Sequence, residues 1–209
     1  MMFENILSKR KIRIFLISLI TGACLTSALQ VYSRNIVEGI SKSVVRLHIV
    51  ANSNSAEDQS LKLKVRDDII KYIEPLLDGA ENVEETKKII VENLDKIEEE
   101  AEKTVKKYGY TYSVTANFGN YDFPTKEYGN VRFPKGGYDA LKIVIEKGNG
   151  KNWWCVLYPQ LCFTENVKGV LPEESEAKLE NTLSNEQYDV ITNKSKINFK
   201  FKIVEWFYN

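Results

Sequence analysis

The stretch Asn152-Trp-Trp-Cys-Val-Leu-Tyr-Pro-Gln-Leu-Cys-Phe163 is the one around which the chain is organised. It holds two of the three tryptophans and two of the three cysteines, so large apolar side chains and sulfur atoms are concentrated within twelve residues. The pattern predicts a strand through Leu157 and then a bend at Pro159, because proline lacks the N–H that a strand ladder needs.

Cys155 and Cys162 would close an eight-residue loop if they were bonded, and the chain-entropy model gives such a bond about 2.5 kcal/mol. A straight strand would separate them by about 23 Å, so the bond requires the chain to fold back, which Pro159 allows. Two unpaired cysteines packed as small hydrophobic residues are the alternative. The sequence leaves both open.

Trp153 and Trp154 are neighbours in the expected strand, and neighbouring strand side chains face opposite ways. They therefore cannot both point to one face of a sheet. We expect one to cover a helix and the other to meet solvent or a partner, since an exposed tryptophan is a typical interface hot spot.

Length and charge restrict the class of protein. The 209 residues, 43% of them hydrophobic, suit one globular domain. The net charge is zero, but residues 1–34 carry five basic residues and one acidic residue, so the rest is weakly acidic. Without a basic stripe, nucleic acid is excluded as the main partner. Three cysteines are also too few for a disulfide-dense mini-protein.

Residues 1–34 have the order of a signal peptide or a membrane anchor. Lys9-Arg-Lys-Ile-Arg13 is basic, and residues 14–33 carry no charge. The strongly apolar part, residues 14–29, is shorter than the ~20 residues that span a bilayer, and Thr26-Ser-Ala28 offers a cleavage site. Cleavage and anchoring both stay open. In either case we expect residues 35–209 to form an exported domain, which contacts the membrane through the N-terminal segment if that segment stays uncleaved.

A strand and a helix are predicted next. Residues 44–50 are rich in β-branched side chains and predict a mostly buried strand. Ser55 and Asp58 have the spacing of a helix N-terminus. Apolar residues then recur every fourth position, at Leu61, Val65, Ile69 and Ile73, and Pro75 should stop this helix before a turn at Asp78-Gly79.

The remaining elements are read from periodicity. Apolar residues spaced by three or four predict one amphipathic helix of about 25 residues from Val83 to Tyr108. Alternation predicts strands at residues 110–118, 138–145 and 197–203, the first two able to pair antiparallel, and a short helix at 173–183. The expected fold is a single α+β domain, an antiparallel or mixed sheet packed by two main amphipathic helices, after an N-terminal hydrophobic segment.

Candidate chemistry is sparse. His48 is the only histidine, and a lone histidine in a β-branched strand is more often structural than catalytic. Metal binding has no second histidine to support it. The loop from Asn52 to Asp58 could hold a ligand, although helix capping accounts for its residues. A thiol–imidazole hydrolase built on Cys155 and His48 rests only on residue availability. We expect no catalytic residues, no metal and no cofactor.

Four motifs resemble a known family. They are Arg46-Leu-His-Ile-Val-Ala-Asn-Ser-Asn-Ser55, Asp58-Gln-Ser-Leu-Lys-Leu-Lys-Val-Arg-Asp67, Phe123-Pro-Thr-Lys126 followed by Tyr128-Gly129, and the stretch that ends at Phe163. In this order they resemble stage II sporulation protein R, over about residues 44–163. Gln160 stands where a second proline is expected, and Glu146 where the family tends to have glycine.

The resemblance implies a signalling protein rather than an enzyme. Such proteins are made in the forespore and exported into the space between the two sporulation membranes. There they trigger a membrane-embedded aspartic protease of the mother cell, which removes the pro-sequence of the sigma-E factor. The family supplies no mapped binding residues, so we select partner-binding candidates from the strands and the aromatic loop: Trp153, Trp154, His48, Asn52, Tyr121, Phe123 and Lys126.

Two other functions stay open at this point. A cell-wall glycan-binding module would use Trp153, Trp154 and the aromatic loop at residues 121–129 as a stacking platform. The hydrolase of Cys155 and His48 is the second.

Overall fold

The N-terminal unit is a helix. The computed structural model describes residues 2–162 and 173–192, and the chain divides into two units, residues 1–39 and 40–209. Helix α1 (Met2–Lys42) makes up the first unit and ends in the second. Its part Lys9–Lys42 is long and apolar enough to cross a membrane, and its large apolar side chains from Ile12 to Tyr32 are exposed. This helix is compatible with export or with membrane anchoring, as the sequence predicts.

A four-stranded mixed sheet lies at the centre of the second unit, in the order β2-β5-β1-β6. Strand β1 (Val45–Val50) runs parallel to β5 (Gly136–Ile145) and antiparallel to β6 (Asn152–Tyr158). Strand β2 (Val114–Phe123) pairs antiparallel with β5, which confirms the predicted pairing. Together with the helices that pack on it, this sheet confirms the α+β class.

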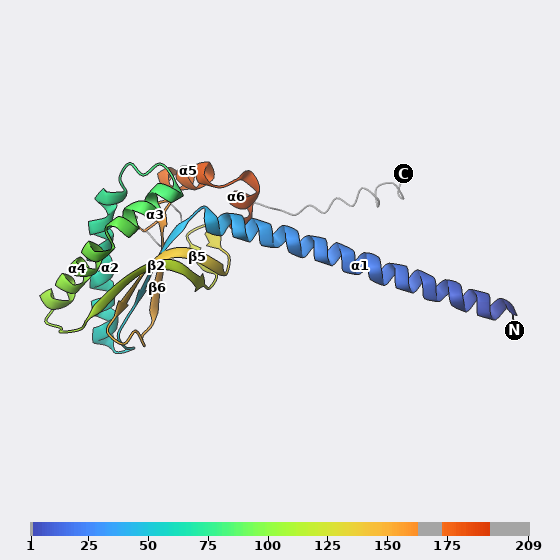
Figure 1. Ribbon diagram of the computed structural model, residues 1–209, viewed down its shortest axis with the longest axis horizontal. Helices are drawn as coiled ribbons and strands as arrows, with labels where there is room; N and C mark the ends of the chain where they lie inside the picture. The colour runs from blue at the N-terminus through green and yellow to red at the C-terminus, as the bar shows by residue number, and fades with distance from the viewer. Residues whose placement is uncertain (1, 163–172, 193–209) are drawn as a thin grey trace. The chain divides into compact units, whose positions relative to one another are not determined.

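Three helices pack on one face of this sheet: α2 (Ala56–Leu77), α3 (Val83–Glu92) and α4 (Leu94–Lys107). Figure 1 shows α2 and α4 side by side. Ser55 caps α2, since its side chain accepts a hydrogen bond from the Asp58 N–H at 3.1 Å. The inward stripe is the predicted one, and it packs against Leu47 and Ile49 of β1. Burial of these apolar side chains is the main term that stabilises the unit.

Pro75 does not stop α2, contrary to the prediction. The helix continues to Leu77, which is 3% exposed in the core. A proline removes only the hydrogen bond of its own missing N–H, to the carbonyl four residues earlier, and Pro75 is exposed. Burial of Leu77 holds the last turn, and the turn then comes at Gly79, whose φ is +89°.

The single helix predicted from Val83 to Tyr108 is also wrong, because Asn93 divides it. Asn93 has φ −110° and ψ 12°, outside helical geometry. Its side-chain Nδ2 donates to the Ile89 carbonyl at 2.8 Å, and its backbone N–H bonds to the Ile89 and Ile90 carbonyls. Asparagine side chains compete for backbone acceptors in this way. Two shorter helices result, α3 and α4, which together with α2 make three on this face.

The β-rich half also differs in its boundaries. β2 begins at Val114 rather than at residue 110, and the tyrosines before it, Tyr110 and Tyr112, contact each other with ring centroids 5.2 Å apart. The predicted aromatic loop at residues 121–129 contains the end of β2 and the strand β3 (Lys126–Tyr128), which pairs in a hairpin with β4 (Val131–Phe133). This hairpin forms a separate two-stranded sheet.

Two short helices follow the sheet. Helix α5 (Glu173–Thr182) agrees with the predicted helix, and α6 (Asn185–Ile191), which was not predicted, packs against β4. Ser184 and Gln187 form a capping box at the start of α6. The strand predicted at residues 197–203 lies outside the described residues.

Glu146 occupies the left-handed region, with φ +52°, at the turn after β5. Its backbone N–H donates to the Ser113 carbonyl at 2.8 Å, and its carboxylate accepts from the Ser113 N–H and hydroxyl at 2.9 Å. Left-handed geometry favours glycine, which gives a physical reason for the glycine that the resemblance leads us to expect at this position. Here the bonds to Ser113 hold the non-glycine residue in that geometry.

Candidate partner-binding surface

The sheet face opposite α2, α3 and α4 carries a continuous aromatic array. Side chains alternate along β1, so Leu47 and Ile49 face the helices while Arg46 and His48 face the other way. We name this array the aromatic face. It consists of Arg46, His48, Tyr121, Phe123, Tyr138 and Trp154.

His48 and Trp154 form the centre of the aromatic face. They are opposite each other in the β1–β6 register, and their rings stack with centroids 3.7 Å apart and an interplanar angle of 16°. Phe123 lies against Trp154 at 4.5 Å and against His48 at 6.0 Å. Trp154 is half-buried, so part of its ring faces solvent. The stack thus presents a tryptophan whose orientation is set by its neighbours.

His48 is held neutral in this position. Burial lowers the pKa of His48 from 6.5 to about 4, against the opposing effect of its hydrogen bond to Asn152. The His48 Nε2 atom lies 2.7 Å from the Asn152 Oδ1 atom, an acceptor, so Nε2–H is the donor. An uncharged imidazole with one hydrogen bond acts here as a packing and orienting group.

Arg46 lies two residues before His48 and is completely buried. Its guanidinium lies 4.2 Å from the Phe123 ring centroid and 4.9 Å from that of Tyr138. The hairpin adds Tyr128, whose hydroxyl oxygen accepts a hydrogen bond from Arg46 Nη2 at 2.7 Å. Cation–π contacts of this kind stabilise a charge away from water. Arg46 thereby ties the hairpin to the main sheet.

Tyr121 extends the aromatic face along β2. It is half-buried and lies opposite Tyr138 in the register, and the Lys142 ammonium lies 5.0 Å from its ring centroid. Together Trp154, Tyr121 and Lys142 give the open part of the face two aromatic rings and one cation. Tryptophan and tyrosine are enriched at protein–protein contacts.

Three of the seven partner-binding candidates lie outside the aromatic face. Trp153 is on the helix-covered face, with the Arg66 guanidinium 5.2 Å from its ring. Asn52 joins two loops: its Nδ2 donates to Asp58 at 2.9 Å, and its Oδ1 accepts from the Lys147 N–H at 3.3 Å. Lys126 begins the hairpin strand β3. The structure therefore brings together His48, Tyr121, Phe123 and Trp154, and the two neighbouring tryptophans do not form one stacking platform.

Cys155 and Cys162 form a disulfide, with Cα atoms 5.7 Å apart. The chain folds back through a cis Tyr158–Pro159 peptide bond, and the Val156 carbonyl accepts the N–H groups of Leu161 and Cys162 at 3.2 Å. Cys155 faces the helices, away from His48. The hydrolase pair is thus not formed, because the sulfur is bonded and lies on the other side of the sheet.

Sequence reasoning missed Arg46, Tyr138 and Asn152. The run of β-branched residues around Arg46 and His48 predicts burial on both faces, and it hides the fact that the two polar residues share one face. Their spacing of two was the available signal. Tyr138 and Asn152 come from strands whose pairing with β1 and β2 is long-range.

A model of the family described as stage II sporulation protein R matches residues 41–168. The chain belongs to this family. The family member from Bacillus subtilis (strain 168), named stage II sporulation protein R, is 40% identical over 139 residues. That alignment covers 66% of this chain and 62% of the relative, less than two thirds of the relative's length. No solved structure matches the chain.

The stage II sporulation protein R match contains every strand of the sheet, the aromatic face and the disulfide. Helices α5 and α6 come after it. The part of the chain shared with the family is thus the part that builds and orients the aromatic face.

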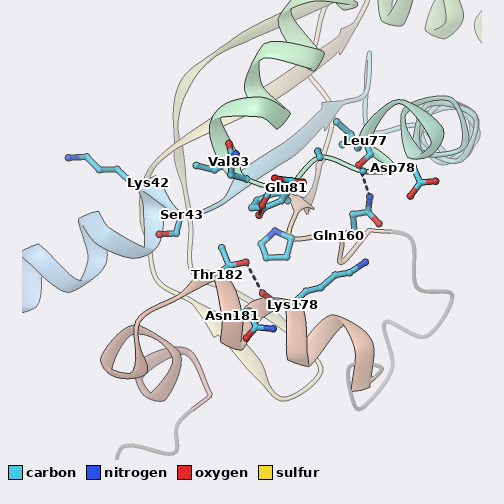
Figure 2. A pocket seen from close by; sticks show the side chains of 15 residues that line it. Lys42, Ser43, Leu77, Asp78, Glu81, Val83, Gln160, Lys178, Asn181 and Thr182 are labelled. Atoms are coloured by element: carbon cyan, nitrogen blue, oxygen red, sulfur yellow. Dashed lines mark hydrogen bonds between the residues drawn. The ribbon is translucent and has the colours of Figure 1, made fainter.

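A cavity of about 510 Å³ is lined both by residues inside the family match and by residues of α5. Figure 2 shows Lys178, Asn181 and Thr182 of α5 across from the loop between α2 and α3. Tyr158 donates to the Glu81 carbonyl at 3.0 Å, and Gln160 Nε2 lies 3.5 Å from the Leu77 carbonyl. The volume suits a small ligand. Internal hydrogen bonds already use several of its polar groups, so we regard the aromatic face as the stronger candidate.

Proposed function

We propose that this chain is an exported sporulation signal that activates a membrane-embedded aspartic protease of the mother cell by direct contact. Activation leads to processing of pro-sigma-E. Membership of the stage II sporulation protein R family is the observation that carries the proposal. The apolar N-terminal helix supports it, since such a signal must leave the forespore and act between the two membranes.

The open part of the aromatic face is the contact surface in this proposal. Trp154 and Tyr121 are half-exposed, and tryptophan and tyrosine are frequent hot spots of protein interfaces. They stand on strands of a sheet whose other face is filled by helices. A rigid support of this kind keeps the entropic cost of binding low, because few groups have to be ordered on contact.

In this proposal the residues around Trp154 hold a binding surface in place and carry out no chemical step. His48 stacks on Trp154, and the Arg46 guanidinium packs on the ring of Phe123, which lies beside Trp154. The disulfide closes the turn after β6. Each of these contacts limits the orientations open to Trp154. The role of the domain is then to offer a preformed surface to which the protease binds.

Co-expression with the protease and pro-sigma-E tests the proposal. The full chain should cause processing of pro-sigma-E, measured by immunoblot of the shortened product. Trp154→Ala should reduce processing about tenfold or more, the effect of losing a hot-spot side chain. The matched control is Tyr108→Ala, a 38% exposed aromatic at the end of α4, which should stay within about twofold of the parent.

Absence of processing with the exported parent chain would overturn the function. Normal processing by a folded Trp154→Ala chain would instead remove the aromatic face as the contact surface. Pull-down on peptidoglycan separates the glycan-binding alternative, which requires binding to the cell wall in the absence of the protease.

A further inference from the structure

Arg46 has a buried donor without a partner. The side chain is 0% exposed, and its Nη1 atom has no hydrogen-bond partner among the described residues. Its polar contacts are the Tyr128 hydroxyl and, at 3.4 Å, the Cys155 carbonyl, and both of these acceptors are neutral. A guanidinium stays protonated in proteins, so a full positive charge lies inside the domain, and no carboxylate of the described residues pairs with it.

The aromatic rings offset only part of this cost. Four ring centroids lie within 5.8 Å of the Arg46 guanidinium carbon, those of Phe123, Tyr138, Phe133 and Tyr128. Rings stabilise the charge but accept no strong hydrogen bond, so the unfilled donor remains. A buried charge is costly unless an ionic partner and hydrogen bonds offset its desolvation.

The hairpin is what covers the guanidinium. Strands β3 and β4 form their own two-stranded sheet, and they follow Pro124 and precede Pro134 in the chain. The Tyr128 hydroxyl fills one arm of the Arg46 fork, through Nη2, while Nη1 stays unfilled. A carboxylate has two oxygens, spaced to accept from both arms at once, and it carries the missing charge. The Tyr128 hydroxyl is therefore a weaker partner for the guanidinium than a carboxylate would be.

We propose that Arg46 is the binding site for a carboxylate of the partner protein, which displaces the Tyr128 hydroxyl and accepts from both terminal nitrogens of the guanidinium. The carboxylate comes from an aspartate or glutamate side chain or from a chain terminus. The partner's identity rests on the proposed function, whereas the carboxylate site itself rests on the geometry of Arg46. Binding would lift the hairpin and uncover Phe123, which is buried and packs against Trp154, and this would join the carboxylate site to the aromatic face.

Acetate is the probe. The full chain in detergent micelles is titrated with sodium acetate at constant ionic strength, with sodium chloride as the balancing salt, and the NMR signal of Arg46 Nε–H is followed. An Arg46→Lys spectrum identifies the signal by its absence. We expect a saturable shift with acetate, and faster amide exchange in the hairpin as its tie to Arg46 is released.

Tyr128→Phe keeps Arg46 and the four aromatic rings around its guanidinium but removes the competing hydroxyl. It should bind acetate about fivefold more tightly, the equilibrium effect of one neutral hydrogen bond. Tyr108→Phe, far from Arg46 on α4, is the matched control and should bind as the parent does. N-acetyl-aspartate amide and N-acetyl-glycine then distinguish a side-chain carboxylate from a terminal one.

A shift with acetate no larger than with chloride would overturn the site, as would unchanged acetate affinity in Tyr128→Phe. The two proposals fail separately. If acetate does not bind but the parent chain still causes processing, only the carboxylate site is lost. If acetate binds and no processing occurs, the protease function is lost and the site remains.

Discussion

His48 shows how one residue links burial to pH. The pKa of His48 is about 4 in the folded chain because burial disfavours the charged ring, whereas an unfolded histidine has a pKa near 6.5. The unfolded chain therefore binds the proton more readily. The stability that neutral His48 contributes is present above pH 6.5 and is lost as the pH falls toward 4.

Acid should consequently destabilise the domain through this one residue. After allowance for solvent that reaches the ring, we expect a loss of about 2 kcal/mol between pH 6.5 and pH 4. Urea unfolding at several pH values measures it. His48→Phe keeps a ring to stack on Trp154 and cannot titrate. The unfolding free energy of His48→Phe minus that of the parent should therefore increase as the pH falls. A constant difference would contradict the lowered pKa.

Single residues also mark where sequence reasoning succeeds and fails. Ser55 was read correctly as a helix start, because a cap is decided by neighbours within one turn. The helix stop predicted at Pro75 and the unbroken helix predicted from Val83 to Tyr108 are both wrong. Apolar periodicity does not register what decides these two positions: the burial of Leu77 two residues after Pro75, and the side-chain bond from Asn93 to Ile89 one turn earlier.

The turn after β6 depends on its disulfide. The Cys155–Cys162 bond closes an eight-residue loop, and a Cys155→Ser, Cys162→Ser double variant should lose about 2.5 kcal/mol of unfolding free energy. Denaturant unfolding of the oxidised parent and the variant measures this loss. Cys24→Ser, which removes an exposed free cysteine, is the control and should leave the unfolding free energy unchanged. Equal stability of parent and double variant would show that the bond adds nothing.

The edge strand β2 is protected by a side chain from α4. The Glu98 carboxylate accepts the Ala116 backbone N–H at 2.7 Å. Glu98→Ala should cost about 2 kcal/mol and leave an open strand edge, which promotes self-association. Denaturant unfolding and size-exclusion chromatography measure the two effects. The exposed neighbour Glu99→Ala should change neither, and an unchanged Glu98→Ala chain would refute the role of this bond.

At the level of elements, local periodicity predicted the helix stripe of α2 and the antiparallel β2–β5 pair. It did not predict that β1 lies between β5 and β6, because no local pattern encodes a partner so far along the chain. The candidate site follows the same rule. His48, Phe123 and Trp154 were chosen as single residues, and only the sheet order brings them together.

The second unit, residues 40–209, should be stable without residues 1–39. Every residue of the main core lies between Val45 and Leu157, inside the second unit. A chain that begins at Ile40 should therefore unfold within about 2 °C of the full chain in the same detergent, measured by circular dichroism. A fall of more than about 10 °C would show that residues 1–39 stabilise the domain.

The central position of β1 has a consequence for how the molecule is made. The residues paired with β1 lie more than ninety positions later, in β5 and β6. The sheet therefore cannot close until most of the chain has been synthesised, and folds with such distant contacts form slowly. The apolar segment of α1 leaves the ribosome long before that moment. During this interval the chain is still unfolded while its N-terminus is already available to a membrane, which is the state in which a polypeptide can be threaded through a narrow channel.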